Sequence, residues 1–229
     1  MNASHHLKGI MKTTFACVSD VHMLHEKIDV PDADVFVCAG DLAVAGTLEE
    51  IREALRWISN LPHRVKILVP GNHDVAMHDP VLLAILRKEF RGVIILVDET
   101  VIVEGLKIHG SPWVPGPYRQ PDHPWAFDIW SVEGRMSKWS MIPDDVDVLI
   151  THGPAVGSLD LDSDGLSRGC VALEHRISRL PKIKLHVFGH IHPSAGTEIR
   201  NGVVLVNAAI AKSDHEVRDP FVVSIQNAA

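Results

Sequence analysis

Residues 65–74 read VKILVPGNHD, and they decide the fold because a predicted strand is followed directly by polar side chains that could form a functional site. The first five, Val65–Val69, are short and mostly apolar, which is typical of a strand buried on both faces. A proline and a glycine end the strand, and Asn72, His73 and Asp74 follow at once. Ligands of open α/β sheets bind beyond the carboxyl ends of the strands, so this stretch predicts a site at one sheet edge.

The same arrangement occurs twice earlier in the chain. Thr13–Ser19 is an apolar run that leads into Asp20 and His22, and Val35–Ala39 leads through a glycine into Asp41. Three consecutive strands therefore deliver carboxylate, amide and imidazole side chains to one edge of the predicted sheet.

Helical patterns separate these strands. Apolar residues recur at helical spacing over 48–58, behind a capping box formed by Thr47 and Glu50. A second helix is expected to begin at Pro80 and to stop near Gly92. The alternation of strand and helix predicts a parallel sheet with helices on its faces.

The second half of the chain contains more strands than helices. We expect a helix from about 170 to 180 and strands over Val93–Val97, Val101–Val103, Leu106–His109, Val146–Thr151, Leu185–Phe188, Val203–Val206 and Phe221–Ile225. This balance predicts an α/β fold of two packed mixed β-sheets flanked by helices. Residues 12–229 are interpreted as a single domain and 1–11 as a leader or flexible N-terminus, with Met11 as a candidate internal start.

Composition excludes several classes of protein. The chain has 229 residues, is 46% hydrophobic and carries a formal net charge of −7, so it is an ordinary globular chain without the basic footprint of a nucleic-acid binder. No apolar stretch approaches 18 residues, so no membrane association is expected. Three distant cysteines do not form a disulfide framework, and we read Cys17 and Cys38 as buried thiols. These features predict a cytoplasmic protein.

Two later strands also end in histidines. Val146–Thr151 leads into His152, and Leu185–Phe188 leads through Gly189 into His190 and His192. Each element alone has a structural explanation as a turn residue, a helix cap or a loop histidine. Five such clusters at the ends of five strands are not explained in that way.

The donors in these clusters suit divalent zinc, manganese, iron or nickel. They number two aspartates, one asparagine and five histidines, more than the three or so protein ligands of one catalytic zinc. The surplus indicates two ions with one carboxylate between them. The other histidines of the chain, His186 among them, are assigned to surface or core without function.

The series Asp-x-His, Gly-Asp, Gly-Asn-His-Asp, a lone His and Gly-His-x-His, running from Asp20 to His192, resembles the calcineurin-like metallophosphoesterases. The stretches SPW (111–113), ITHGP (150–154) and HVFGHIH (186–192) are similar to small metallophosphoesterase-domain-containing proteins related to class III cyclic-nucleotide phosphodiesterases. The resemblance implies the four-layer αββα metallophosphoesterase sandwich.

The resemblance also implies roles for individual residues. The metal ligands it implies are Asp20, His22 and His192 for the first ion, Asn72, His152 and His190 for the second, and Asp41 as the bridge between them. His73 would be the catalytic histidine that faces the substrate, and Asp74 would hydrogen-bond His73 and set its orientation. Manganese is the expected metal, with iron, zinc, nickel and magnesium left open.

The function that the resemblance implies is hydrolysis of a small-molecule phosphodiester, including cyclic nucleotides such as 2′,3′-cyclic AMP. A hydroxide bridging the two ions would attack phosphorus, with His73 as the acid. A phosphomonoesterase or protein phosphatase on the same site stays open, as does a non-catalytic binding scaffold. The physiological substrate, the native metal and the oligomeric state are not predicted.

The proline-rich segment 111–124 and the aromatics near it have two interpretations. Trp113, Tyr118, Trp125 and Trp130 either form a flap that stacks a nucleobase or simply bury the loop, and the second interpretation is favoured.

Overall fold

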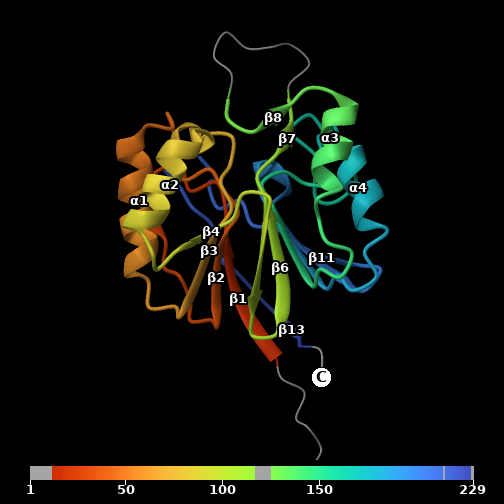
Figure 1. The fold of residues 1–229 in the computed structure, drawn as a ribbon, viewed down its shortest axis with the longest axis horizontal. Coiled ribbons are helices and arrows are strands. Elements are labelled where there is room, and N and C mark those ends of the chain that lie inside the picture. The colour runs from red at the N-terminus through yellow and green to blue at the C-terminus, as the bar shows by residue number, and fades with distance from the viewer. Residues whose placement is uncertain (1–11, 117–124, 214, 228–229) are drawn as a thin grey trace, which may run out of the picture.

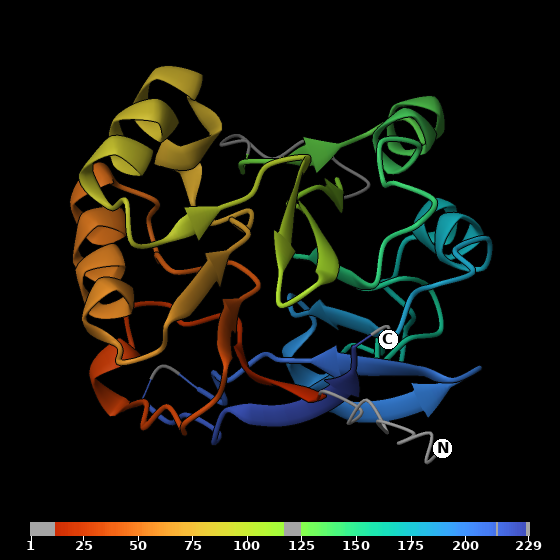
Figure 2. The same ribbon diagram turned by 60° about the horizontal axis from the view of Figure 1, so that its bottom comes forward.

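Two β-sheets face each other at the centre of the molecule, and helices cover their outer faces (Figures 1 and 2). The computed structural model describes residues 12–116, 125–213 and 215–227. The α-helices are α1 (Leu48–Asn60), α2 (Pro80–Glu89), α3 (Val132–Trp139) and α4 (Val171–Ile177). Helices α1 and α2 lie on one side of the sheets and α3 and α4 on the other. The α/β architecture of two packed mixed sheets is therefore confirmed.

The first sheet has the order β13-β1-β2-β3-β4. Its strands are β1 (Lys12–Val18), β2 (Val35–Cys38), β3 (Val65–Leu68), β4 (Ile94–Ile95) and β13 (Phe221–Gln226). β1 to β4 run parallel, and β13 pairs antiparallel with β1. The parallel sheet that the alternation of strand and helix predicted is therefore confirmed, with β13 as an added antiparallel edge strand.

The second sheet has the order β11-β12-β10-β9-β6-β5. Its strands are β5 (Glu99–Val103), β6 (Leu106–Ser111), β9 (Val148–Thr151), β10 (Leu185–Phe188), β11 (Gly196–Arg200) and β12 (Val203–Asn207). The four central strands are parallel, and β5 and β11 are antiparallel edges.

The core between the sheets explains the continuous apolar runs in the sequence. Phe15, Val37 and Ile67 of the first sheet belong to the same buried cluster as Ile108 and Val187 of the second. Separate clusters lie beneath the helix pairs, so each sheet is covered on both faces. The two predicted buried thiols, Cys17 and Cys38, are confirmed as fully buried.

Helix α1 shows how local sequence sets an element. The Thr47 hydroxyl accepts a hydrogen bond from the Glu50 amide, and the Glu50 carboxylate accepts one from the Thr47 amide, as the capping box predicts. Ile51, Leu55 and Ile58 bury the inner face against the first sheet.

Several elements differ from prediction. α2 ends at Glu89 and not near Gly92, and α4 ends three residues before Leu180. Neither α3 nor β11 was predicted: α3 buries one side chain fully, Trp139, and contains a glycine, so its periodic signal is weak. In the region read as a loop, a two-stranded parallel ribbon joins β7 (Val114–Pro115) to β8 (Asp128–Ile129).

Three short 3₁₀ helices complete the elements: η1 (His25–Lys27), η2 (Val75–His78) and η3 (His192–Ser194). The expected N-terminal leader, residues 1–11, and Tyr118 lie outside the described residues. Within the part of the chain that the structure describes, every helix is too short or too polar to cross a membrane.

Candidate metal centre

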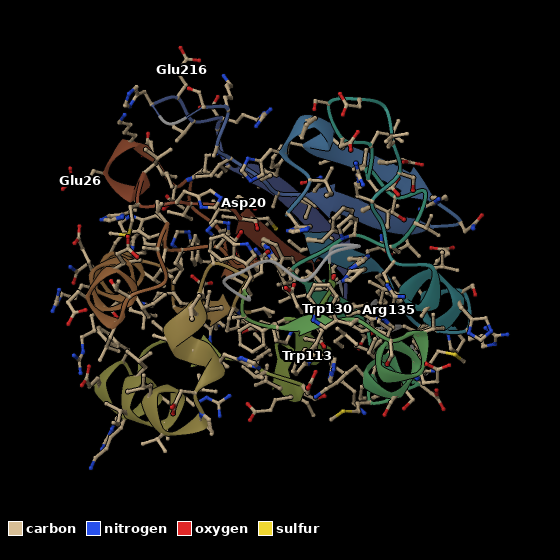
Figure 3. All side chains as sticks on the ribbon, turned by 90° about the horizontal axis from the view of Figure 1, so that it is seen from above. Asp20, Glu26, Trp113, Trp130, Arg135 and Glu216 are labelled. Carbon is tan, nitrogen blue, oxygen red and sulfur yellow. The ribbon has the colours of Figure 1, made fainter. Side chains whose placement is uncertain are left out.

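The carboxyl ends of five parallel strands meet at one edge of the paired sheets. β1, β2 and β3 of the first sheet and β9 and β10 of the second each lead into a predicted site residue. Figure 3 looks down on this edge, with Asp20 near the middle of the view. Six of the predicted side chains form two compact groups, each with its donor atoms within 4.8 Å of one another: Asp20, His22 and His192, and Asp41, His152 and His190.

The first group surrounds a fully buried carboxylate. Asp20 accepts hydrogen bonds from the His190 backbone amide at 3.1 and 2.9 Å, one to each oxygen. His192 Nε2 lies 3.1 Å from Asp20 Oδ1, and the His22 ring centroid lies 5.3 Å from that of His192. One carboxylate and two imidazoles therefore converge from β1 and β10.

The second group is more deeply buried. His152 is fully buried, and its Nε2 lies 3.3 Å from Asp41 Oδ2 and 2.9 Å from Asn72 Oδ1. The His190 ring packs edge-on against His152, with centroids 5.0 Å apart. Asn72, predicted as a ligand from its place after β3, is thus brought into this group.

Asp41 lies between the two groups. Its Oδ2 atom is 3.3 Å from His152 Nε2 in the second group and 3.9 Å from His22 Nε2 in the first. Its other oxygen accepts a hydrogen bond from the His73 amide at 2.8 Å. One carboxylate oxygen is therefore held beside nitrogen donors of both groups, the position that a bridging ligand requires.

Three backbone carbonyls of the segment after β2 orient three histidines. The Nδ1 atoms of His152, His22 and His73 lie 2.8, 3.1 and 2.8 Å from the carbonyl oxygens at positions 39, 43 and 44. Each Nδ1–H donates to its carbonyl, so Nε2 is the nitrogen left for a ligand or a substrate. Sequence patterns cannot reveal these partners, because every residue has a carbonyl.

The electrostatics show that the centre needs positive charge. Burial lowers the pKa of His152, but the charge and hydrogen bond of Asp41 outweigh burial and raise that pKa to about 9. Burial raises the pKa of Asp41, yet the facing histidines bring it well below its ordinary value. Both ring nitrogens of His152 face oxygen atoms, which favours the protonated ring in the metal-free protein. A divalent cation could bind Nε2 in place of that proton. The donor set therefore fits divalent ions.

Backbone strain concentrates at the same residues. Asp20, His22, Asp41 and His190 all have positive φ angles, of 55°, 41°, 55° and 70°. Residues with a Cβ rarely adopt this conformation, and each such residue costs of order 1–3 kcal/mol. The tight turns aim these side chains back over the strand ends, and the surrounding sheets hold them there.

The expected hydrogen bond between Asp74 and His73 is wrong. The fully buried Asp74 carboxylate accepts hydrogen bonds from the backbone amides of Leu42, Ala43 and Gly71, at 2.9, 3.1 and 2.8 Å. The His73 ring instead bonds the Val44 carbonyl, and Asp74 joins the turn after β2 to the turn after β3. Burial and the charge of Asp41 raise the pKa of Asp74 to about 7.

His186 has a supporting role that the sequence did not indicate. Thr151 donates its hydroxyl proton to the Gly153 carbonyl at 2.7 Å, so it accepts a hydrogen bond from His186 Nε2 at 2.8 Å. This pair braces the turn that carries His152. Burial lowers the pKa of His186 to about 3, so the ring is neutral.

Trp113 and Trp125 pack in different ways near the site. Trp113 is partly buried against Phe127 and donates its indole N–H to Asp98 at 2.8 Å, so it does bury the loop. Trp125 instead lies on the His73 ring, with centroids 4.0 Å apart, and keeps 38% of its surface exposed.

With this geometry in place, comparison with known proteins is informative. The profile described as calcineurin-like phosphoesterase matches residues 13–194, which include every predicted site residue. The chain belongs to the calcineurin-like phosphoesterase family. Family membership and the two donor groups together support metal-dependent phosphoesterase activity, with a dinuclear divalent centre.

Curated relatives are similar to this chain over most of its length, and a solved structure shares its fold. Metallophosphoesterase domain-containing protein 1 of Homo sapiens is 32% identical over 236 residues, covering 93% of this chain and 71% of that protein. A UPF0046 protein of Caenorhabditis elegans is 31% identical over 240 residues, covering 93% and 81%. TT1561 of Thermus thermophilus shares the fold alone, with a TM-score of 0.56 and 14% identity over 86% of this chain and 89% of that one.

Gly189 tests the tight packing between the two sheets at this centre. A Cβ at Gly189 would overlap Ser19 Oγ and Asp20 Oδ2, so Gly189→Ala must displace the Asp20 carboxylate. In protein loaded with manganese as the test ion, we expect the variant to hold less metal than the wild type and to lose about 1–3 kcal/mol of unfolding free energy. Elemental analysis and urea unfolding measure both effects.

Gly92→Ala is the control, since nothing lies within 4 Å of a Cβ there. Full manganese content and unchanged stability in Gly189→Ala would contradict the expected packing.

The buried neutral His186 predicts an acid-sensitive fold. Its folded pKa of about 3 lies below the ordinary value of 6.5, so below pH 6.5 the unfolded chain binds a proton that the folded chain refuses. The stability that His186 contributes is complete above about pH 6.5 and is lost progressively as the pH falls towards 3. Between pH 7.5 and 5 the loss is about 2 kcal/mol.

Urea unfolding of the metal-free protein at the two pH values measures this loss. His186→Gln keeps a donor for Thr151 and removes the titration, so its stability should fall by about 2 kcal/mol less than that of the wild type. Parallel pH dependence in both proteins would show that His186 does not titrate in this way.

Proposed function

We propose that the protein is a dimetal-dependent phosphodiesterase that hydrolyses small phosphodiesters, including cyclic nucleotides. The observation that carries the proposal is the position of Asp41 Oδ2 between two donor groups, with His73 beside them. The His73 ring lies 4.9 Å, centroid to centroid, from the ring of His22.

The seven predicted ligands would divide between two ions. The first would be held by Asp20, His22 and His192, and the second by Asn72, His152 and His190, with Asp41 shared. When bound, two divalent ions supply a hydroxide nucleophile at neutral pH and offset charge on the phosphoryl oxygens. Manganese is the proposed metal.

The protein's own contribution is to place an acid. His73 Nδ1–H donates to the Val44 carbonyl at 2.8 Å, which fixes the ring and leaves Nε2 for the leaving-group oxygen. A protonated His73 would give that oxygen its proton as the ester bond breaks, a contribution worth about 10²–10⁴-fold in rate. Asp74 acts at a distance, because it joins the turns that carry Asp41 and His73.

A monoanionic diester suits the charges of this site. Among the described residues, the ion-pair partners of Asp20 and Asp41 are all histidines, with no lysine or arginine. The described neighbours of these carboxylates therefore offer imidazole, and no ammonium or guanidinium group, to a second ionised phosphate oxygen, which favours a diester over a monoester. Poor alkoxide leaving groups, as in 2′,3′-cyclic AMP, also gain most from an acid at His73.

The substrate class can be tested with a matched pair of chromogenic esters. We expect the manganese-loaded protein to hydrolyse bis-p-nitrophenyl phosphate with a kcat/KM at least about tenfold above that for p-nitrophenyl phosphate, and to open 2′,3′-cyclic AMP. The reverse preference would assign a phosphomonoesterase. No hydrolysis of any of the three by protein with two bound ions would assign a binding scaffold.

His73→Ala separates chemistry from metal binding. The variant removes the acid but none of the seven ligands, so we expect two bound ions and a kcat for an alkyl diester reduced about 10²–10⁴-fold. Elemental analysis and steady-state kinetics on 2′,3′-cyclic AMP measure the two quantities. Unchanged turnover with both ions present would remove His73 from the mechanism.

A further inference from the structure

Trp125 occupies a place that packing alone does not explain. Its ring lies across His73 at a centroid separation of 4.0 Å and an interplanar angle of 32°, so it covers one face of the proposed acid. Yet 38% of Trp125 stays exposed, although burial of a tryptophan is strongly favourable. One face of the indole lies on His73, and part of the side chain stays exposed to solvent.

The protein backbone holds Trp125 in this position. The next residue, Ala126, is buried and donates its amide to the carbonyl of Asn72 at 3.0 Å. Phe127 is buried too, and its carbonyl accepts a hydrogen bond from the Val114 amide at 3.1 Å, at the start of the β7–β8 ribbon (Figure 1). The indole is therefore fixed from one side by a turn of the metal centre and from the other by the ribbon.

Two residues whose backbones bond to His73 carry exposed apolar side chains. Val44, whose carbonyl accepts from His73 Nδ1, is 51% exposed, and Val75, whose amide donates to the His73 carbonyl, is 38% exposed. Trp125 packs on the His73 ring, and two residues bonded to His73 through their backbones carry exposed apolar side chains. Nothing comparable is needed to bind the phosphate itself, which is anionic.

We propose that Trp125 is a specificity-determining residue, whose exposed indole surface receives a flat aromatic group carried on the leaving-group side of the ester, an aryl ring or a nucleobase, beside His73. The inference rests on the proposed function, because it takes His73 as the residue next to the leaving group. Stacking of a base on an aromatic side chain strengthens binding severalfold to about a hundredfold.

Trp125 has a simpler alternative role, which is to shield or orient His73 without touching the substrate. In that case its loss would weaken catalysis for every ester equally and would not change the relative binding of aromatic and small ligands. The two roles therefore separate in a binding measurement that involves no turnover.

The experiment compares two non-hydrolysable phosphonates that differ only in their organic group. Isothermal titration calorimetry of the manganese-loaded protein measures Kd for phenylphosphonate and methylphosphonate. We expect the wild type to bind phenylphosphonate roughly tenfold more tightly. Trp125→Ala should reduce this preference to twofold or less, and Trp125→Phe should keep most of it.

Trp130→Ala is the matched control, since Trp130 is a second tryptophan, 41% exposed, that lies against Gly116. This control should keep the wild-type preference, and manganese content and thermal unfolding confirm that each variant is folded. A wild type without preference for the phenyl compound, or a preference that survives in Trp125→Ala, would overturn the inference. Hydrolysis of bis-p-nitrophenyl phosphate by the wild type is measured separately, so the proposed function can stand or fall by itself.

Discussion

Two buried carboxylates that require positive charge are the constraint on which the rest of this molecule depends. Asp20 is fully buried and Asp41 nearly so, at the line where the edges of two sheets meet. A buried charge is stable only with charged or hydrogen-bonding partners close by. The backbone amides of His190 and His73 supply part of that stabilisation, and the imidazoles of His192 and His152 supply more. Divalent ions would complete it.

The packing of the two sheets against each other brings these groups together. Neither sheet alone contains a complete donor group, because the first contributes Asp20 and Asp41 and the second contributes His152, His190 and His192. A continuous apolar core between the sheets sets their spacing. The same core stabilises turns in which four ligand residues adopt positive φ angles.

Much of the fold and of the convergence of the candidate side chains could be predicted from sequence, since both rest on local signals. An apolar run that leads into Asp20, Asp41 or His152 predicts both a strand and the candidate site residue that follows it. Parallel strands then place such residues at one edge of the sheet. Helix α3 gave little signal, because Trp139 is the one side chain it fully buries. The partners of individual side chains could not be predicted from sequence. Asp74 follows His73 in the chain, but its carboxylate accepts hydrogen bonds from the backbone amides of two neighbouring turns.

Tertiary contacts also gave unexpected roles to residues that looked ordinary. His186 was assigned to surface or core without function, yet it braces the turn of His152 through Thr151. Trp125 was expected to bury its loop, and instead it lies half-exposed on His73. In both cases the partner is more than thirty residues away in sequence, so no local pattern could report the contact.

The most direct test of the central claim is anomalous diffraction from crystals grown with manganese, recorded at an energy where manganese scatters anomalously. The account predicts two peaks, one within the group of Asp20, His22 and His192 and one within the group of Asn72, His152 and His190, with Asp41 Oδ2 in contact with both. About 3.5–4 Å should separate them. A single peak, or manganese bound elsewhere with these side chains joined only by their own hydrogen bonds, would contradict it.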